Sequence, residues 1–280
     1  MTNLKNKRII SAAVTGSWST KEMNPNVPIS NQEIAESVWK SWEAGAAVAH
    51  VHVRNEDGTP SSDFAKYKDL VDIIRSKEEC DVVLNITSSG GLGFTDQDRI
   101  EPLVQLKPEM ASFDAGTLNW QHSTVFENNP SFLKKLGNSL NEKNIKPEIE
   151  IFHPGMIDEA LYYHKIGVLK DPLHFQFVLG IAGGMQATVE NLVFLKSMLP
   201  ENSTWAASGV SKGHMPILLA TIAMGGHLRV GLEDNVYYQK GLLAESNEQL
   251  VDRTKRILEE AGLEAATPSE AREILGLRGR

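Results

Sequence analysis

Eight short apolar runs, rich in β-branched residues, alternate along the chain with longer stretches of helical periodicity. A helix between consecutive strands carries the chain back over the sheet, so this alternation predicts an α/β fold with parallel strands. The expected strands span residues 8–14, 47–53, 82–86, 110–113, 147–152, 173–179, 204–207 and 227–230.

The expected helices fill the spaces between these strands and follow the last one. The first begins near Ser30, because Glu33 three residues later completes a capping-box pattern. The others cover residues 63–76, 97–105, 130–143, 156–166, 189–198, 215–224, 247–261 and 269–275. Eight βα units in 280 residues average about 35 residues each, a size that suits a (β/α)8 TIM barrel. No Pro-, Gly- or Ser-rich linker divides the chain, so we expect residues 1–280 to form one barrel domain with a short C-terminal tail helix.

The competing architecture is an open, doubly wound sheet. Such a sheet usually carries a Gly-rich phosphate-binding turn after its first strand. Here that turn reads Thr15-Gly16-Ser17-Trp18, which lacks the required glycine spacing. The barrel is therefore preferred, and it predicts a functional site at the C-terminal ends of the strands.

Composition excludes several classes of protein. The chain is 41% hydrophobic and 23% charged, which is typical of a globular protein and not of a disordered one. It has no run of about 18 apolar residues and no cleavage-type site near its start, so we expect neither a membrane span nor a signal peptide. The one cysteine, Cys80, suits a reducing cytoplasm. The net charge of −8 argues against a broad nucleic-acid surface but permits a local site for an anion.

Two histidines, His50 and His52, end the second expected strand. Residues two apart on a strand point to the same face, so both imidazoles are expected to face the barrel interior near its functional end. Two neutral imidazoles at this spacing can bind one metal ion such as zinc. The alternative is one hydrogen-bonded core histidine beside a coincidental second one.

Strand eight ends with three charged residues, Arg229, Glu233 and Asp234. In a closed barrel only strand one separates this strand from strand two, so Glu233 is a candidate third ligand beside the two histidines. Asp234 is then a candidate general base, with Arg229 as the partner that keeps it ionised. The alternative is an ion network at the end of the barrel.

Three hydroxyl- and glycine-rich segments also follow strands. Thr87–Gly91 after strand three can hold a carboxylate, and residues 114–120 follow strand four with a similar composition. Gly209, Ser211 and Lys212 follow strand seven, where barrels often bind phosphate. For the segments after strands three and four, ordinary turn chemistry is the alternative when either is taken alone.

Other titratable residues leave their roles open. Glu148 and Glu150 alternate on strand five, so both are expected to face the interior, where a carboxylate needs a partner. His153 and His174 near the ends of strands five and six are further potential ligands. The remaining histidines show no cluster; they are His122, His164, His214 and His227.

Taken together, these residues resemble the β-keto acid cleavage enzyme family over essentially the whole chain. The landmarks are Thr15-Gly16, Asn26-Val27-Pro28-Ile29, Glu43-Ala44-Gly45-Ala46, His50-Val51-His52-Val53-Arg54, Lys107-Pro108-Glu109-Met110, Asp114-Ala115-Gly116-Thr117-Leu118-Asn119, His174-Phe175-Gln176-Phe177-Val178-Leu179-Gly180 and Gly231-Leu232-Glu233-Asp234-Asn235. The resemblance implies a zinc-containing barrel that converts a β-keto acid and acetyl-CoA to acetoacetate and a new acyl-CoA. It also implies assembly as a homotetramer, for which apolar Val236, Tyr237 and Tyr238 are a candidate interface.

The same resemblance assigns roles to residues of this sequence. His50, His52 and Glu233 match the zinc ligands, and Asp234 with its partner Arg229 matches the base that removes a proton from C2. The matched substrate-binding positions are Thr87 for the carboxylate, Thr117, and, in the same motif as Thr117, Asn119.

Two departures from the family pattern concern the substrate. Members that act on an amino substrate carry an acidic residue two positions after Thr-Gly, and this chain has Trp18 there. Trp18 suits an apolar tail or a quaternary ammonium group such as that of dehydrocarnitine, unless it only packs the barrel mouth. The segment from Thr87 is also rearranged by one residue, which leaves the carboxylate contact open between Thr87 and Ser88.

Two rival functions come from other classes. An amidohydrolase-type metal-dependent hydrolase also uses a barrel with an H-x-H pair, but on strand one. A sensor that binds a metal or an acyl-CoA without turnover is the non-enzymatic alternative.

Overall fold

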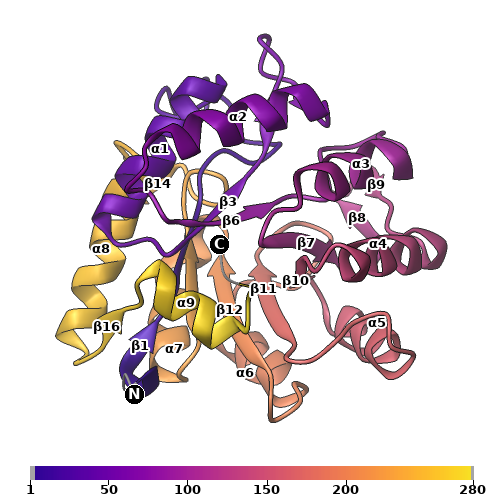
Figure 1. The fold of residues 1–280 in the computed structure, drawn as a ribbon. Coiled ribbons are helices and arrows are strands. Elements are labelled where there is room, and N and C mark those ends of the chain that lie inside the picture. Colours follow the sequence, from indigo (N-terminus) through magenta and orange to yellow (C-terminus); the bar gives the residue numbers. More distant parts are fainter. Residues whose placement is uncertain (1–3, 279–280) are drawn as a thin grey trace.

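The computed structural model describes residues 4–278 and shows a closed barrel of eight parallel strands (Figure 1). Going round, each strand pairs with the next one along the chain, and the eighth pairs with the first. This confirms the predicted (β/α)8 fold. The strands are β2 (Ile10–Ala13), β3 (Val48–Val51), β6 (Val83–Ile86), β7 (Met110–Asp114), β10 (Lys146–Ile151), β11 (His174–Leu179), β12 (Thr204–Gly209) and β13 (His227–Val230).

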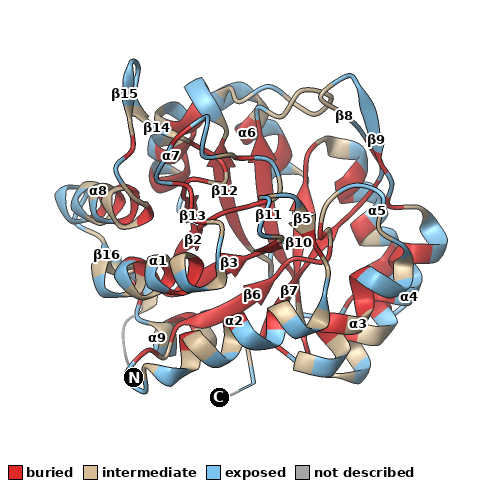
Figure 2. Cartoon of the chain, turned by 90° about the horizontal axis from the view of Figure 1, so that it is seen from above, coloured by how far each residue is buried: buried red, intermediate tan, exposed pale blue. Residues whose placement is uncertain are grey.

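Helices surround the barrel, with their exposed faces outward and their buried faces against the strands (Figure 2). They are α1 (Asn31–Ala44), α2 (Phe64–Ser76), α3 (Asp96–Leu106), α4 (Pro130–Glu142), α5 (Pro154–Lys165), α6 (Val189–Ser197), α7 (His214–Ala223), α8 (Asn247–Glu260) and α9 (Pro268–Leu275). The expected capping box is present, since Ser30 caps α1 and the Glu33 carboxylate returns to the Ser30 backbone N–H. None of the described helices is long and apolar enough to cross a membrane.

The tail helix α9 lies across the N-terminal end of the barrel (Figure 1). Its Ala271 and Leu275 pack on a small apolar cluster at the start of the strands. Arg272 donates two hydrogen bonds of 2.6 and 2.9 Å to the Glu109 carboxylate and fixes the helix there. This end of the barrel is therefore covered, and the opposite end is left for the site.

Two expected strands end differently from the prediction. The expected strand 8–14 is interrupted at Ile9, whose N–H donates to His227 Nδ1. Before this point the short strand β1 (Lys7–Arg8) pairs outside the barrel with β16 (Glu264–Ala265). Residues 47–53 also divide. Val53–Arg54 form β4, which pairs with β5 (Pro60–Ser61) because the Arg54 guanidinium bonds the carbonyls of Gly16 and Gly58.

Two further hairpins rise from the C-terminal ends of the strands. One consists of β8 (Leu118–Trp120) and β9 (Thr124–Phe126), and the other of β14 (Tyr237–Gln239) and β15 (Leu242–Leu243). Short 3-10 turns cover Leu4–Asn6 and Ser211–Gly213.

The inner face of the barrel is unusually polar. Outward-facing strand residues pack on the helices, whereas buried polar side chains from most strands fill the interior, among them Ser11, His50, Asn85, Ser112, Glu148, Glu150, Gln176, Ser208 and Arg229. A packed barrel interior is normally dominated by branched apolar residues. Burial of so many polar groups is costly unless they bond one another, so the interior serves the site more than the stability of the fold.

Asn247 joins the loop after β13 to the rest of the barrel. This fully buried side chain accepts from the Leu232 N–H (2.8 Å) and donates to the Val14 carbonyl (2.9 Å) and the Ser37 hydroxyl (2.8 Å). Leu232 directly precedes Glu233 and Asp234, so this one amide fixes the start of the segment that carries them.

We predict that Asn247→Ala lowers the free energy of unfolding by about 2 kcal/mol or more, because it leaves a buried donor and a buried acceptor without partners. Urea denaturation measures this change. The control is Asn202→Ala at an exposed position, for which we expect a change within about 0.5 kcal/mol. Equal stability of the two variants contradicts the assigned role of Asn247.

Candidate active site

A cavity of about 1230 Å³ opens at the C-terminal ends of the barrel strands. Its wall is largely aromatic and apolar, with contributions from Trp18, Met23, Trp120, Phe126, Phe152 and Tyr237. Its floor is charged and holds Asp114, Glu150, Arg229, Glu233 and Asp234 beside His50 and His52. An apolar wall with convergent polar groups at its base is the usual form of a site for a small molecule.

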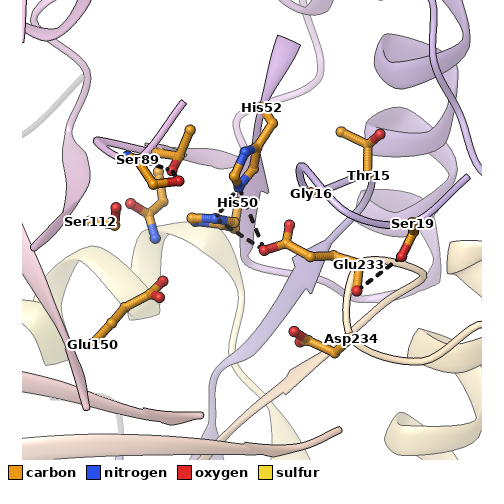
Figure 3. Close-up of polar contacts among 12 residues, drawn as sticks. Thr15, Gly16, Ser19, His50, His52, Ser89, Ser112, Glu150, Glu233 and Asp234 are labelled. Carbon is orange, nitrogen blue, oxygen red and sulfur yellow. Dashed lines mark hydrogen bonds and ion pairs between the residues drawn. The ribbon is translucent and has the colours of Figure 1, made fainter. Parts of the chain in front are cut away.

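His50, His52 and Glu233 converge at the floor (Figure 3). The Nε2 atoms of the two histidines lie 3.1 Å apart, and Glu233 Oε1 lies 3.6 Å from His50 Nε2 and 3.5 Å from His52 Nε2. Three ligand atoms of a tetrahedral zinc ion, each about 2.0–2.1 Å from the metal, are about 3.3 Å from one another. The three donor atoms therefore fit one zinc ion.

The chain places these ligands by closing the barrel. His50 lies on β3 and His52 just after it, whereas Glu233 follows β13, and β2 lies between the two strands. Gly16 follows β2 and packs on the Glu233 side chain; a Cβ there would lie 2.5 Å from Glu233 Cγ. With a φ of +64°, this position suits glycine on both counts.

The protonation of these groups also suits metal binding. Burial lowers the pKa of His50 well below its usual range, so the imidazole is neutral and has a free lone pair. Burial alone would raise the pKa of Glu233, but the two imidazoles and the Arg229 guanidinium hold that pKa below its ordinary value. Glu233 Oε2 is buried and has no hydrogen-bond partner among the described residues, which leaves it available to a ligand.

A second group of ligand-type atoms, from His50, Glu148 and Glu150, lies beside the first. Burial raises the pKa of Glu148 to about 7 and that of Glu150 well above its usual range. A carboxyl group that retains its proton is a weak metal ligand. The set with Glu233 is therefore the better metal site.

Arg229 joins the buried carboxylates. It donates to both oxygens of Asp234 (3.0 and 3.2 Å), to Glu150 Oε1 (2.9 Å) and to Glu233 Oε1 (2.7 Å). The structure thus brings together the expected pair of Arg229 and Asp234. Burial raises the pKa of Asp234, and the Arg229 guanidinium opposes that rise.

The interior has more carboxyl groups than guanidinium charge to balance them. Arg229 lies within 4.0 Å of Glu148, Glu150, Glu233 and Asp234, while Asp114 Oδ2 is buried without a hydrogen-bond partner in the described chain. Burial raises the pKa of Asp114 as well. Such an excess of acidic groups is relieved by protonation of some of them or by the binding of a further cation.

In the segment after β6, which was expected to hold a carboxylate, alternate side chains point in opposite directions. Thr87 and Ser89 line the cavity, and their hydroxyl oxygens lie 3.0 Å apart. Ser88 is fully buried behind them, where its N–H donates to Ser112 Oγ at 2.9 Å. Of the two candidates, only Thr87 reaches the cavity. Ser89 was missed, although its two-residue spacing from Thr87 is the signal that identifies it.

Two expected substrate contacts lie elsewhere. Thr117 is exposed and accepts a hydrogen bond from the Asn128 N–H (3.0 Å), and Asn119 is exposed on β8. Neither is among the described residues that line the cavity; Asp114 and Trp120 represent this segment there. The β8–β9 hairpin carries the chain over the rim of the barrel. Thr117 and Asn119 therefore lie outside the cavity, although their motif predicted contact with the substrate.

The structure separates the remaining candidates. Trp18, which is 50% exposed, lines the cavity, as do Ser211 and Lys212, but Gly209 is buried in β12 and accepts from Asn235. His174 lies deeper in the barrel, 2.9 Å from Thr204 Oγ1.

Other expected positions have different surroundings. His153 precedes α5 as its N-terminal cap residue. Val236, Tyr237 and Tyr238, considered above as an interface, line the cavity.

Comparison with known proteins decides the family. Residues 7–277 match the family described as beta-keto acid cleavage enzyme. The chain belongs to this family. It is 45% identical over 273 residues to the 3-keto-5-aminohexanoate cleavage enzyme of Fusobacterium nucleatum, with 97% of this chain and 98% of that protein covered. The protein of the same name from Acetoanaerobium sticklandii is 43% identical, with 97% of this chain and 98% of that protein covered.

Solved structures support the same fold at lower identity. The complex of ObcA with oxaloacetate superposes with a TM-score of 0.81 and 20% identity, covering 90% of this chain and 68% of that one. At this identity the likeness concerns the fold alone. This member of the family is thus a closed barrel, and at its open end three residues that could bind a metal ion lie together.

We predict that purified protein contains about one zinc ion per chain, and that His50→Ala and Glu233→Ala each lose most of it because two ligands remain. Elemental analysis after dialysis measures the metal. His164→Ala, a histidine on α5 outside the cluster, is the matched control and should retain zinc. Full zinc in either ligand variant would show that the metal is held elsewhere.

Proposed function

We propose that this protein is a zinc-dependent acyltransferase that converts a β-keto acid and acetyl-CoA to acetoacetate and a new acyl-CoA. The observation that carries the proposal is the His50, His52 and Glu233 set at the floor of an open cavity, directly beside an Asp234 that Arg229 holds. Family membership and the names of the relatives support the reaction class.

Zinc held by His50, His52 and Glu233 supplies a Lewis acid that polarises a carbonyl oxygen. Asp234 supplies the base. Both of its oxygens accept from Arg229, which favours the ionised carboxylate in spite of burial. In this role Asp234 takes a proton from C2 of the keto acid, the carbon between its ketone and its carboxylate.

Glu150 positions Arg229 for this task. Its Oε1 atom accepts a hydrogen bond of 2.9 Å from Arg229 Nη1, on the opposite side of the guanidinium from Asp234. A planar guanidinium held at both ends cannot rotate away from the base. Thr87 and Ser89 offer hydroxyl donors to the substrate carboxylate on the other wall of the cavity.

The tail of the substrate meets a wall that is aromatic. Trp18, Trp120 and Phe126 line the cavity. These rings favour a tail with a positive charge through cation–π contact. An amino-substituted keto acid and a quaternary ammonium keto acid such as dehydrocarnitine both have this property, and Trp18 favours the second.

The rival functions have less support. The hydrolase requires its H-x-H pair on the first barrel strand, whereas β2 precedes β3 and His50 lies on the second. A sensor without turnover has no use for the bidentate pair of Arg229 and Asp234. Cytoplasmic location and the tetramer stay predictions. Half-exposed Val193, Phe194 and Leu219 on α6 and α7 offer a further apolar surface for assembly.

Turnover of a panel of keto acids tests the proposal. Purified protein is incubated with acetyl-CoA and dehydrocarnitine, 3-keto-5-aminohexanoate, 3-ketohexanoate or 3-oxoadipate, and acetoacetate is measured by mass spectrometry. We expect acetoacetate from a cationic keto acid, at a rate well above that from the neutral or acidic ones. Loss of the keto acid without acetyl-CoA would indicate a hydrolase, and no turnover at all would indicate a sensor.

Substitution of the base gives a separate prediction. Asp234→Asn is expected to retain zinc but to lower kcat by about 10²–10⁴, because an amide cannot accept the C2 proton. The control, Asp252→Asn at an exposed position on α8, should keep the wild-type kcat. Near wild-type kcat in Asp234→Asn would remove this residue as the base.

A further inference from the structure

The charges that line the cavity are segregated by depth. The floor carries the carboxyl groups and Arg229, whereas the mouth carries two exposed lysines, Lys212 and Lys240. Lys212 follows β12, and Lys240 lies at the turn of the β14–β15 hairpin. Within residues 4–278 neither lysine has an ion-pair partner. Two unpaired cations on the lining give the mouth a positive charge that attracts an anion, on a protein of net charge −8.

The β14–β15 hairpin is held firmly at its base. The fully buried Asn24 donates to the carbonyls of Val236 and Ala244, each at 2.8 Å, and these two residues bond each other across the hairpin. Arg253 on α8 donates to the Tyr238 carbonyl at 2.6 Å and lies over its ring, 4.4 Å from the centroid. The hairpin is therefore an anchored arm that carries Lys240 at its end, and its exposed position is visible in Figure 2.

An apolar stretch of wall separates the mouth from the floor. Val210 and Met215 flank Lys212 along the cavity, and Val178 and Ile181 lie on the same wall. A ligand that fills the whole cavity thus has an anionic end at the mouth, a long middle part on apolar wall, and a reactive end at the metal-type ligands. A CoA thioester has this order of phosphates, pantetheine arm and thioester.

We propose that Lys240 binds the phosphate groups of the CoA thioester together with Lys212, so that the β14–β15 hairpin is a CoA-binding arm. This inference rests on the proposed function. The ammonium group of Lys240 contributes a point charge and hydrogen bonds to phosphate oxygens. Lys212 follows β12, the barrel strand beside β13, and the aromatic residues of the arm, Tyr237 and Tyr238, line the cavity next to Lys240 in the sequence.

The test compares Lys240→Ala with the wild type by titration calorimetry with CoA and by kinetics. Loss of one charge-assisted contact is expected to weaken CoA binding about ten-fold. The ratio of kcat/KM for acetyl-CoA to kcat/KM for S-acetylpantetheine, which lacks the phosphates, should fall by a similar factor. Lys240→Arg should restore most of the binding. Lys134→Ala, an exposed lysine on α4, is the matched control and should bind CoA as the wild type does.

The outcomes separate this inference from the proposed function. Unchanged CoA affinity and an unchanged kcat/KM ratio in Lys240→Ala would overturn the arm even if the wild type turns over keto acids. If Lys240→Ala binds CoA more weakly but the wild type turns over no keto acid, the result would support CoA binding by the hairpin and contradict the acyltransferase function. Absence of CoA binding to the wild type would overturn both. Circular dichroism of each variant checks that it is folded.

Discussion

The site depends on one buried cation, the Arg229 guanidinium. It donates hydrogen bonds to Asp234, Glu150 and Glu233 at once, and it opposes the rise in pKa that burial imposes on each of these three carboxyl groups. Removal of Arg229 would leave several unpaired acidic groups in the barrel, so the arrangement requires it. Arg229 alone does not balance these groups. The ligand atoms of His50, His52 and Glu233, which lie 3.1–3.6 Å from one another, suit a metal ion as a second cation.

Barrel closure turns this local chemistry into a site. The ligands come from β3 and β13, which are distant in sequence and neighbours of β2 in space. Gly16 after β2 and Asn247 before α8 then fix the Glu233 segment from two sides. The proposed chemistry, with a base beside a Lewis acid, needs both groups at fixed positions, because a displacement of about 1 Å is costly in rate.

Much of this could be predicted from the sequence, because two simple periodicities determine it. Strand parity gave the inward direction of His50, His52, Glu148 and Glu150, and alternation of elements gave the barrel. The same alternation places Ser89 on the side of Thr87, facing the cavity, and Ser88 on the other side. The rim was not predictable in this way: Thr117 and Asn119 lie on a hairpin that leaves the barrel, and Lys240 reaches the mouth only through the β14–β15 arm. Hairpin direction depends on tertiary contacts such as those of Asn24 and Arg253, which local patterns do not encode.

The fate of the acetyl group tests the central claim most directly. The protein is given unlabelled keto acid and acetyl-CoA with ¹³C at both acetyl carbons, and the products are analysed by mass spectrometry and NMR. In the proposed reaction C2 loses its proton and attacks the acetyl carbonyl, CoA thiolate leaves and attacks the former ketone carbon, and the C2–C3 bond breaks. This sequence predicts acetoacetate with label at C3 and C4 and a new acyl-CoA without label. Unlabelled acetoacetate, or label in the new acyl-CoA, would contradict the proposed function of this site.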